Sequence, residues 1–168
     1  MSCESLEINF SDFNTENAEN MSYMFYLCPS IKKIDISNFN IKNVTNMREM
    51  FCSCNALEEV NLANLNGKKV NNMIKLFYGC SSLKMINFSN LNTENVSDMS
   101  YMFYRCKLLK DLDLSSFNTS NVIKMNNMFD GCSSLKNINF IQFNTRNVND
   151  MSYMFYGCKS LKKENIIT

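Results

Sequence analysis

The sequence contains no histidine, a single proline and only four glycines among its 168 residues. Without histidine, the mixed cysteine–histidine sites that hold zinc cannot form. The scarcity of proline and glycine argues against long flexible linkers and glycine-rich phosphate loops. No apolar run approaches the roughly 18 residues that a membrane-spanning helix requires. The first ten residues, MSCESLEINF, lack the basic start and apolar segment of a secretory signal.

The sequence also has no excess of charge of one sign. The chain has 17 basic and 16 acidic residues, well mixed, and a net charge of +1. This balance argues against a nucleic-acid partner or an anionic membrane surface. What is abundant is apolar material, with 13 phenylalanines and 13 methionines in a chain that is 45% hydrophobic. We therefore expect a well-packed core that needs no metal and no disulfide.

The sequence repeats itself every 26 residues without an insertion. Four residue types each recur six times at this period. These columns are Met21, Met47, Met73, Met99, Met125 and Met151; Phe25, Phe51, Phe77, Phe103, Phe129 and Phe155; Cys28, Cys54, Cys80, Cys106, Cys132 and Cys158; and Asn14, Asn40, Asn66, Asn92, Asn118 and Asn144. One such unit cannot bury its apolar face alone, so we expect neighbouring units to stack.

Each unit combines two hydrophobic periodicities. Val44, Met47, Met50, Phe51 and Cys54 follow the spacing of one helical face, which predicts a short helix. In the segment LLKDLDL at 108–114, Leu109, Leu112 and Leu114 pass from a spacing of three to the alternation of a strand. We expect an α/β solenoid of about six units, each with one short parallel strand and one short helix. Residues 1–168 should form this single domain, with units near 1–13 (partial), 14–39, 40–65, 66–91, 92–117, 118–143 and 144–168.

The repeat resembles a known family. Residues 109–118 follow the pattern L-x-x-L-x-L-x-x-F-N, which looks like the strand motif of leucine-rich repeats. The longer phrase at 92–118, NTENVSDMSYMFYRCKLLKDLDLSSFN, resembles the 26-residue repeat of BspA-like leucine-rich-repeat surface proteins, including mycoplasma-type lipoprotein repeats. The resemblance covers roughly residues 8–163. It implies a leucine-rich-repeat solenoid that is located at the cell surface or secreted and that takes part in adhesion or in binding host or partner proteins.

The outward side chains of the predicted strands are the candidate partner-binding residues. Side chains alternate along a strand, so the residues between the core positions face away from the core. Several of these positions vary from unit to unit, as a custom recognition surface would. The face comprises Lys33, Asp35, Ser37, Glu59, Asn61, Met85, Asn87, Ser89, Asp111, Asp113, Ser115, Asn137, Asn139 and Ile141. Two alternatives stay open: an unconstrained solvated surface, and a binding face on the opposite side built from Tyr23, Tyr101 and Tyr153.

Two columns are expected to be structural ladders. They are Asn40, Asn66, Asn92, Asn118 and Asn144, and Cys54, Cys80, Cys106 and Cys132. Asparagine at a repeated turn can bond the backbone of its own turn and of the next. The cysteines are expected to be buried free thiols. Their 26-residue spacing fits no zinc pattern, and stacked Cβ vectors that run parallel oppose disulfide bridges. No metal and no cofactor is predicted.

The function expected from these patterns is non-enzymatic binding of a protein partner. No nucleophile–base pair and no paired carboxylates stand outside the repeat, which argues against an enzyme. The alternative is a structural spacer or self-assembling scaffold element, because uncapped repeat ends favour end-to-end self-association. The sequence does not name the ligand, and a surface or secreted location is implied by the resemblance alone.

Overall fold

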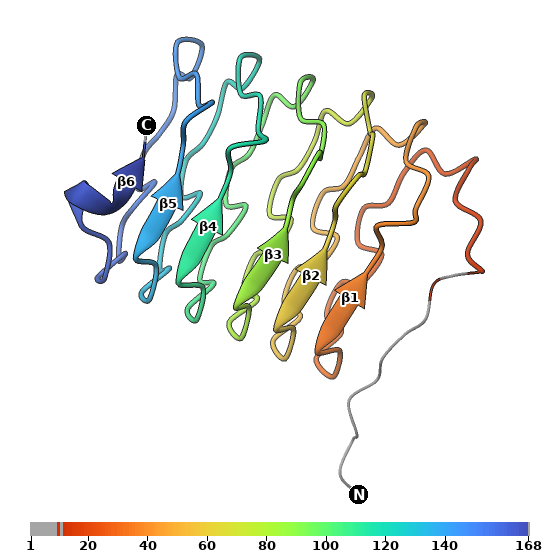
Figure 1. Ribbon diagram of the computed structural model, residues 1–168, viewed down its shortest axis with the longest axis horizontal. Helices are drawn as coiled ribbons and strands as arrows, with labels where there is room; N and C mark the ends of the chain where they lie inside the picture. The colour runs from red at the N-terminus through yellow and green to blue at the C-terminus, as the bar shows by residue number, and fades with distance from the viewer. Residues whose placement is uncertain (1–9, 11, 168) are drawn as a thin grey trace, which may run out of the picture.

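The computed structural model describes residues 10 and 12–167. Six short strands lie side by side in chain order (Figure 1). They are β1 (Lys33–Asp35), β2 (Glu59–Asn61), β3 (Met85–Asn87), β4 (Asp111–Asp113), β5 (Asn137–Asn139) and β6 (Ile166–Ile167). The strand pairs are all parallel, which confirms the short parallel strands that the sequence predicted. Most of the predicted partial unit, 1–13, lies outside the described residues.

The strand register follows the 26-residue period. Lys33 pairs with Glu59, and Glu59 pairs with Met85; in the second sheet Asp111 pairs with Asn137. The central residue of each of the strands β1 to β5 points towards the core because side chains alternate along a strand. Ile34, Val60, Leu112 and Ile138 are accordingly buried. The strands form two three-stranded sheets, β1-β2-β3 and β4-β5-β6.

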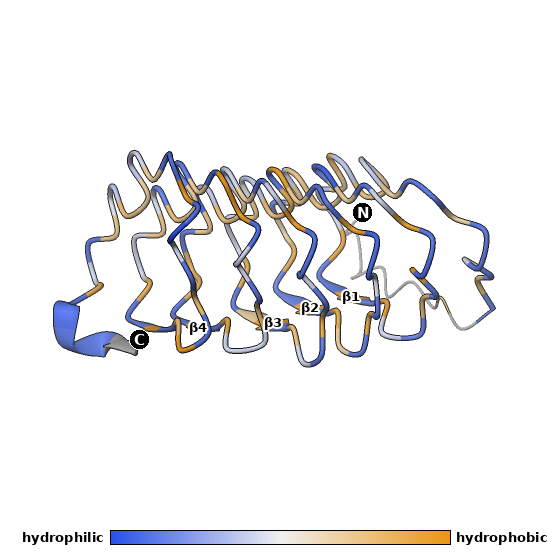
Figure 2. Cartoon of the chain, turned by 90° about the horizontal axis from the view of Figure 1, so that it is seen from above, coloured by the Kyte–Doolittle hydropathy of each residue, from blue (hydrophilic) through white to orange (hydrophobic). Residues whose placement is uncertain are grey.

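A second wall of the chain, opposite the strands, is built from turns (Figure 2). Isolated parallel bridges link equivalent residues of successive units along it, from Asn20↔Asn46 to Lys124↔Asp150. Beneath these bridges the phenylalanine column forms one stack from Phe25 to Phe155. Neighbouring ring centroids are 5.1–5.7 Å apart, and their planes lie within 9° of parallel. Burying each such ring stabilises the fold by about 1.5–3 kcal/mol.

The predicted helix is wrong. Its residues form consecutive tight turns instead, in which the N–H groups of Met50 and Cys52 each bond a carbonyl three residues back. The alternate N–H groups, those of Glu49 and Phe51, bond carbonyls of the next unit. Glu49 has φ of +55° and Ser53 has φ of +61°, a left-handed conformation that an α-helix does not contain. The one short helical turn described is the 3₁₀ helix η1 (Lys163–Asn165).

Unit thickness explains why turns replace the helix. An α-helix with its side chains is about 10 Å across. The phenylalanine rings show that successive units on the turn wall are only 5.1–5.7 Å apart, close to the spacing of about 4.8 Å between strands. Helices would therefore collide unless the turn wall spread apart. The turns place Met47, Met50, Phe51 and Cys54 in the core all the same, so the sequence spacing imitates a helical face.

The last strand departs from the 26-residue register. Ile138 pairs with Ile166, which lies 28 residues later. A 26-residue step would place Glu164 at the inward position held by Ile138 in β5. Glu164 lies instead in η1, where it is exposed and within 4.0 Å of Lys162. Because an unpaired carboxylate is costly to bury, the extra turn keeps this charge out of the core.

Candidate functional site

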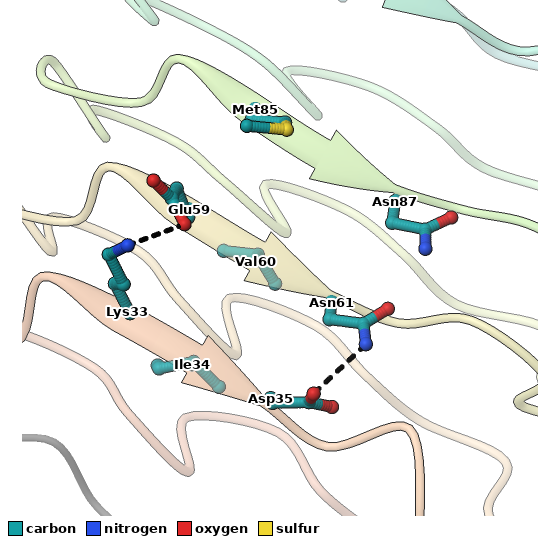
Figure 3. Close-up of a pocket in the computed structure, with 8 residues that line it drawn as sticks. All are labelled: Lys33, Ile34, Asp35, Glu59, Val60, Asn61, Met85 and Asn87. Atoms are coloured by element: carbon teal, nitrogen blue, oxygen red, sulfur yellow. Dashed lines mark hydrogen bonds and ion pairs between the residues drawn. The ribbon is translucent and has the colours of Figure 1, made fainter.

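The candidate site is the outward face of the strands. The structure exposes or half-exposes every side chain that the sequence assigned to this face. Those on β1, β2 and β3 surround a shallow depression that has Met85 and Asn87 at one side (Figure 3). A second depression runs over β4 and β5 and includes Lys84 and Met85. The predicted residues that lie on the strands themselves are thus brought together in two neighbouring groups on one wall, whereas Ser37, Ser89, Ser115 and Ile141 line neither depression.

Side chains on the first group pair across strands. Lys33 Nζ lies 2.9 Å from a Glu59 carboxylate oxygen, and Asn61 Nδ2 donates to Asp35 Oδ2 at 3.0 Å (Figure 3). Both pairs join strands that are adjacent in the sheet. Exposed ion pairs of this kind contribute roughly 0.2–1 kcal/mol, so their main effect is to fix the positions of the side chains. Met85 and Asn87 carry no charge and continue the two rows across β3.

The protonation of Asp35 is set by its neighbours. Partial burial raises the pKa of the Asp35 carboxyl, but three hydrogen bonds to the carboxylate act in the opposite direction. The Ser37 hydroxyl donates at 2.7 Å and the Ser37 N–H at 2.9 Å, and Asn61 is the third donor. The net result is a pKa below the ordinary value, so Asp35 presents a negative charge at neutral pH.

The second group is linked in a similar way. Asn137 donates a short hydrogen bond to Asp111, and Asn165 Nδ2 donates to Asn137 Oδ1 at 2.8 Å. Asp111 and Asp113 both project from β4, and neither forms an ion pair with a described residue. This half of the face therefore presents negative charge beside amide groups.

One outward column has a structural role that the sequence did not reveal. Each of the strands β1 to β5 ends on aspartate or asparagine, whose Oδ1 accepts the N–H two residues later. These bonds are Asp35 with Ser37 (2.9 Å), Asn61 with Ala63 (3.1 Å), Asn87 with Ser89 (3.0 Å), Asp113 with Ser115 (2.9 Å) and Asn139 with Ile141 (3.1 Å). Such Asx turns need a short side chain with an acceptor oxygen. The column is therefore polar because its side chains end the strands β1 to β5.

The asparagine ladder is only half as predicted. Asn40, Asn92, Asn118 and Asn144 each accept an N–H of their own turn, at 2.9–3.2 Å. Links between units are made by the threonines that follow instead. Thr119 Oγ1 donates to the Asn144 carbonyl at 3.1 Å and accepts the Asn144 N–H at 2.8 Å. Thr15 and Thr93 hold Asn40 and Asn118 in the same way. The recurrence of threonine after asparagine was the available signal.

The cysteine column lies inside the fold. Cys54, Cys80, Cys106 and Cys132 are buried free thiols, and each donates its S–H to a phenylalanine carbonyl of the previous unit at 2.9–3.2 Å. Burial raises the pKa of the Cys54 thiol to about 11. Among the residues that the structure describes, no group of histidine, cysteine, aspartate or glutamate is placed to hold a metal ion.

The tyrosines occupy the turn wall. Tyr78 and Tyr104 stack with ring centroids 4.6 Å apart, and Tyr101 packs edge-on against Tyr104. Tyr23 and Tyr153 are about half and two-thirds exposed, at 48% and 65%. The structure thus divides the predicted tyrosines into rings that pack between units and rings that face solvent.

These features define a repeat protein whose short parallel strands stack at a 26-residue period. The chain matches the family model described as "Mycoplasma protein of unknown function, DUF285" over residues 1–86 and 72–167, and it belongs to this family. A solved leucine-rich repeat protein of T. pallidum (TpLRR) is similar at 15% identity, covering 81% of this chain and 74% of that one, with a TM-score of 0.35. No curated protein matches the sequence. No helix within the described residues is long and apolar enough to cross a membrane.

Proposed function

We propose that this protein is a BspA-like leucine-rich-repeat solenoid that binds another protein through its outward strand face. In this proposal it is located at the cell surface or secreted and takes part in adhesion or in contact with a host or partner protein. The observation that carries the proposal is the contrast between a constant frame and variable outward positions. The inward centres of the strands stay aliphatic, whereas the outward row reads Lys33, Glu59, Met85, Asp111 and Asn137.

The shape of the face favours a protein as the ligand. The two depressions are shallow and share one wall, and their side chains are held by cross-strand bonds such as Lys33–Glu59. A rigid, broad and mixed surface suits a protein partner, whereas small molecules are usually enclosed in deep pockets. Catalysis has no place in the proposal, since the sequence has no histidine and the polar groups of the face are engaged largely with one another.

The test uses substitutions that leave the Asx turns intact. Met85→Lys, Asp111→Lys and Ile141→Lys change the charge of the face without touching a capping side chain. Binding of the labelled protein to a panel of purified surface and matrix proteins is measured by biolayer interferometry. We expect saturable binding of the wild type to a member of the panel, with at least a tenfold loss in the triple variant.

A matched variant separates charge from location. Asn55→Lys, Thr145→Lys and Glu19→Lys add three lysines, with the same change of net charge, at exposed positions away from the strand face. This control should bind as the wild type does, and circular dichroism should show both triple variants folded. Equal losses in the two variants, or no loss in either, would remove the strand face as the binding surface.

A second candidate function is a spacer or self-assembling element. Met151 and Phe155 are 47% and 37% exposed, although Met125 and Phe129 are fully buried by the unit that follows them. This apolar face fits a further unit of the same repeat. Static light scattering over a concentration series tests self-assembly: a rising mass that Phe155→Glu abolishes supports it, and a constant monomer mass excludes it.

A further inference from the structure

The sheet is interrupted between β3 and β4. On one side of the break, the Met85 N–H donates to the Glu58 carbonyl at 3.1 Å. On the other side, the Asn137 N–H donates to the Lys110 carbonyl at 3.2 Å. The equivalent Asp111 N–H has no such partner on β3 among the described residues, and the two strands fall in separate sheets (Figure 1). The units remain joined on the turn wall, where Asn72 bridges to Asp98 and Asp98 to Lys124.

A second donor is left open at the far end of the break. The Leu62 N–H bonds the Asn87 carbonyl at 2.9 Å, and the Leu114 N–H bonds the Asn139 carbonyl at 3.2 Å. Phe88 occupies the same position in its unit, but its N–H has no partner on the next unit in the described chain. The break therefore leaves main-chain groups unpaired on both strands that border it.

Two phenylalanines account for the break. The rings of Phe88 and Phe117 meet edge to face with centroids 5.0 Å apart. Between β2 and β3 the equivalent pair of repeat positions is occupied by Leu62 and Leu91. Two aromatic rings need more room than two leucines, and a dense core answers such overpacking by moving the backbone. The Ser116 hydroxyl donates to the Phe88 carbonyl at 3.1 Å, so a side chain reaches across the break.

The break opens the apolar floor to solvent. Ile86, the centre of β3, is half-buried, although its equivalents in β1, β2, β4 and β5 are buried. A crevice beside it is lined by Asn87, Ser89, Asp113 and Ser116. The larger depression over β4 also includes Ile86 and Asp113, with Met85 and Asp111 at its rim. The two hollows therefore meet at Ile86 and Asp113.

Asp111 and Asp113 place negative charge over this opening, and no described residue forms an ion pair with either carboxylate. Asp111 accepts a hydrogen bond from Asn137, and Asp113 Oδ1 accepts the Ser115 N–H. The other carboxylate oxygen, Asp113 Oδ2, accepts no hydrogen bond from the described residues. The outward neighbours on β3 are Met85 and Asn87, neither of them basic. Lys84, which lines the larger depression, is held by Glu58 at 2.6 Å. The opening thus combines an apolar floor, an anionic wall and free main-chain donors.

We propose that the β3–β4 opening is the docking point for an extended segment of a protein partner that presents an arginine. The arginine stem lies over Met85 and Ile86, and its guanidinium meets the Asp113 and Asp111 carboxylates. Long basic side chains combine an apolar stem with a charged head in this way, and guanidinium–carboxylate hydrogen bonds are the strong, directional kind. A carbonyl of the same segment accepts a free N–H of Phe88 or Asp111. This inference rests on the proposed function and assigns the part of the face that carries its specificity.

The test uses a defined probe on the whole chain. The peptide acetyl-Thr-Val-Arg-Val-Thr-amide is titrated into ¹⁵N-labelled protein, and the same peptide with citrulline in place of arginine is the neutral control. We expect saturable amide shifts at Ile86, Phe88, Asp111, Asp113 and Ser115, with at least tenfold weaker binding of the citrulline peptide. Equal binding of both peptides, shifts centred on other strands, or no saturable shift up to millimolar peptide would each overturn the proposal.

The charge of Asp113 is tested with one variant at that position and one matched control variant elsewhere on the chain. Asp113→Asn keeps the Asx-turn oxygen and removes the charge, so we expect it to fold and to bind the arginine peptide about tenfold more weakly. Asp98→Asn makes the same change at a turn-wall residue that also caps an N–H, that of Ser100 at 2.8 Å, and should bind like the wild type. Equal affinities of the two variants would contradict the proposal.

The two proposals fail independently. If the peptide results fail while the triple lysine variant of the strand face still loses its protein partner, the face binds elsewhere and the proposed function stands. If that triple variant keeps its partner, the strand face is not the binding surface, whatever the peptide does.

Discussion

The Ile41 side chain fills the space that a side chain at position 67 of the next unit would occupy. A Cβ atom placed on Gly67 would lie 2.5 Å from Ile41 Cδ1 and 2.8 Å from Val70 Cγ2, closer than such atoms approach. In three other units this repeat position is a threonine that links its unit to the next, as Thr119 does with Asn144. The pair of Ile41 and Gly67 thus replaces a hydrogen-bonded link by apolar packing.

This pairing predicts compensating substitutions. Gly67→Thr alone should lower the free energy of unfolding by about 1–3 kcal/mol, because it overpacks a filled site. With Ile41→Thr present as well, the hydroxyl of the new threonine at 67 has room to donate to the Asn92 carbonyl, as the Thr93 hydroxyl donates to that of Asn118. Urea denaturation of the four proteins in this double-mutant cycle measures the coupling. An equal effect of Gly67→Thr in both backgrounds would show that Ile41 is not the obstacle.

The buried threonine links between units should contribute to the free energy of unfolding. Thr119 is fully buried, and Thr119→Val leaves both the N–H and the carbonyl of Asn144 without their partner. We expect a loss of about 1–3 kcal/mol in the free energy of unfolding, the usual cost of unpaired buried polar groups. Thr145→Val changes the same repeat position where it is exposed and should alter stability by less than about 0.5 kcal/mol. Comparable losses for the two variants would argue against the link.

The explanation of the sheet break is open to a direct test. Phe117→Leu should let β3 and β4 approach, so that the amide protons of Phe88 and Asp111 exchange with solvent more slowly than in the wild type. Native-state hydrogen exchange by NMR measures both amides. Phe143→Leu, at the same repeat position beside the intact β4–β5 pairing, should leave these two amides unchanged. Unaltered exchange in Phe117→Leu would mean that the phenylalanine pair does not hold the sheets apart.

The buried thiols predict a loss of stability at high pH. Burial raises the pKa of Cys54 to about 11 from the 9.0 of an exposed thiol. In this interval the unfolded chain releases the proton and the folded chain keeps it, so the stabilisation is complete below pH 9 and declines as the pH rises towards 11. Cys54→Ala should therefore show a shallower decline than the wild type in urea denaturation at pH 8, 9, 10 and 11. The difference in slope is at most about 1.4 kcal/mol per pH unit, and identical slopes would contradict the assignment.

The strands were predictable from particular residues. From Leu109 the spacing of leucines passes from three to the alternation of Leu112 and Leu114 with polar neighbours, and the structure places β4 at Asp111–Asp113 among them. The 26-residue step likewise predicts the pairing of Glu59 with Met85. Both features depend on local alternation and on period, which are properties of sequence. The helix failed for the opposite reason: the spacing of Met47, Phe51 and Cys54 states which residues are buried but not how thick the segment that buries them is.

The candidate face was predictable as a set of outward residues but not as a site. The sequence assigns Met85, Asp111 and Asp113 to one wall because they alternate with core positions. It carries no sign that the Asp113 column caps the strand ends, since an Asx turn depends on a side chain meeting an N–H two residues away. It also gives no sign that β3 and β4 part, because that break arises where Phe88 meets a residue of the following unit.

By itself the sequence determined the period, the parallel strands, the inward and outward residues, and the absence of histidine-based chemistry. Those properties follow from the order and type of residues along the chain. Only the tertiary structure decided that tight turns replace helices, that Thr119 and its equivalents link the units, and that the sheet opens beside Ile86. Each of these depends on the distance between neighbouring units, which is set by side chains that pack through space, as in the Phe77–Phe103 stack and, at the opening, the Phe88–Phe117 contact.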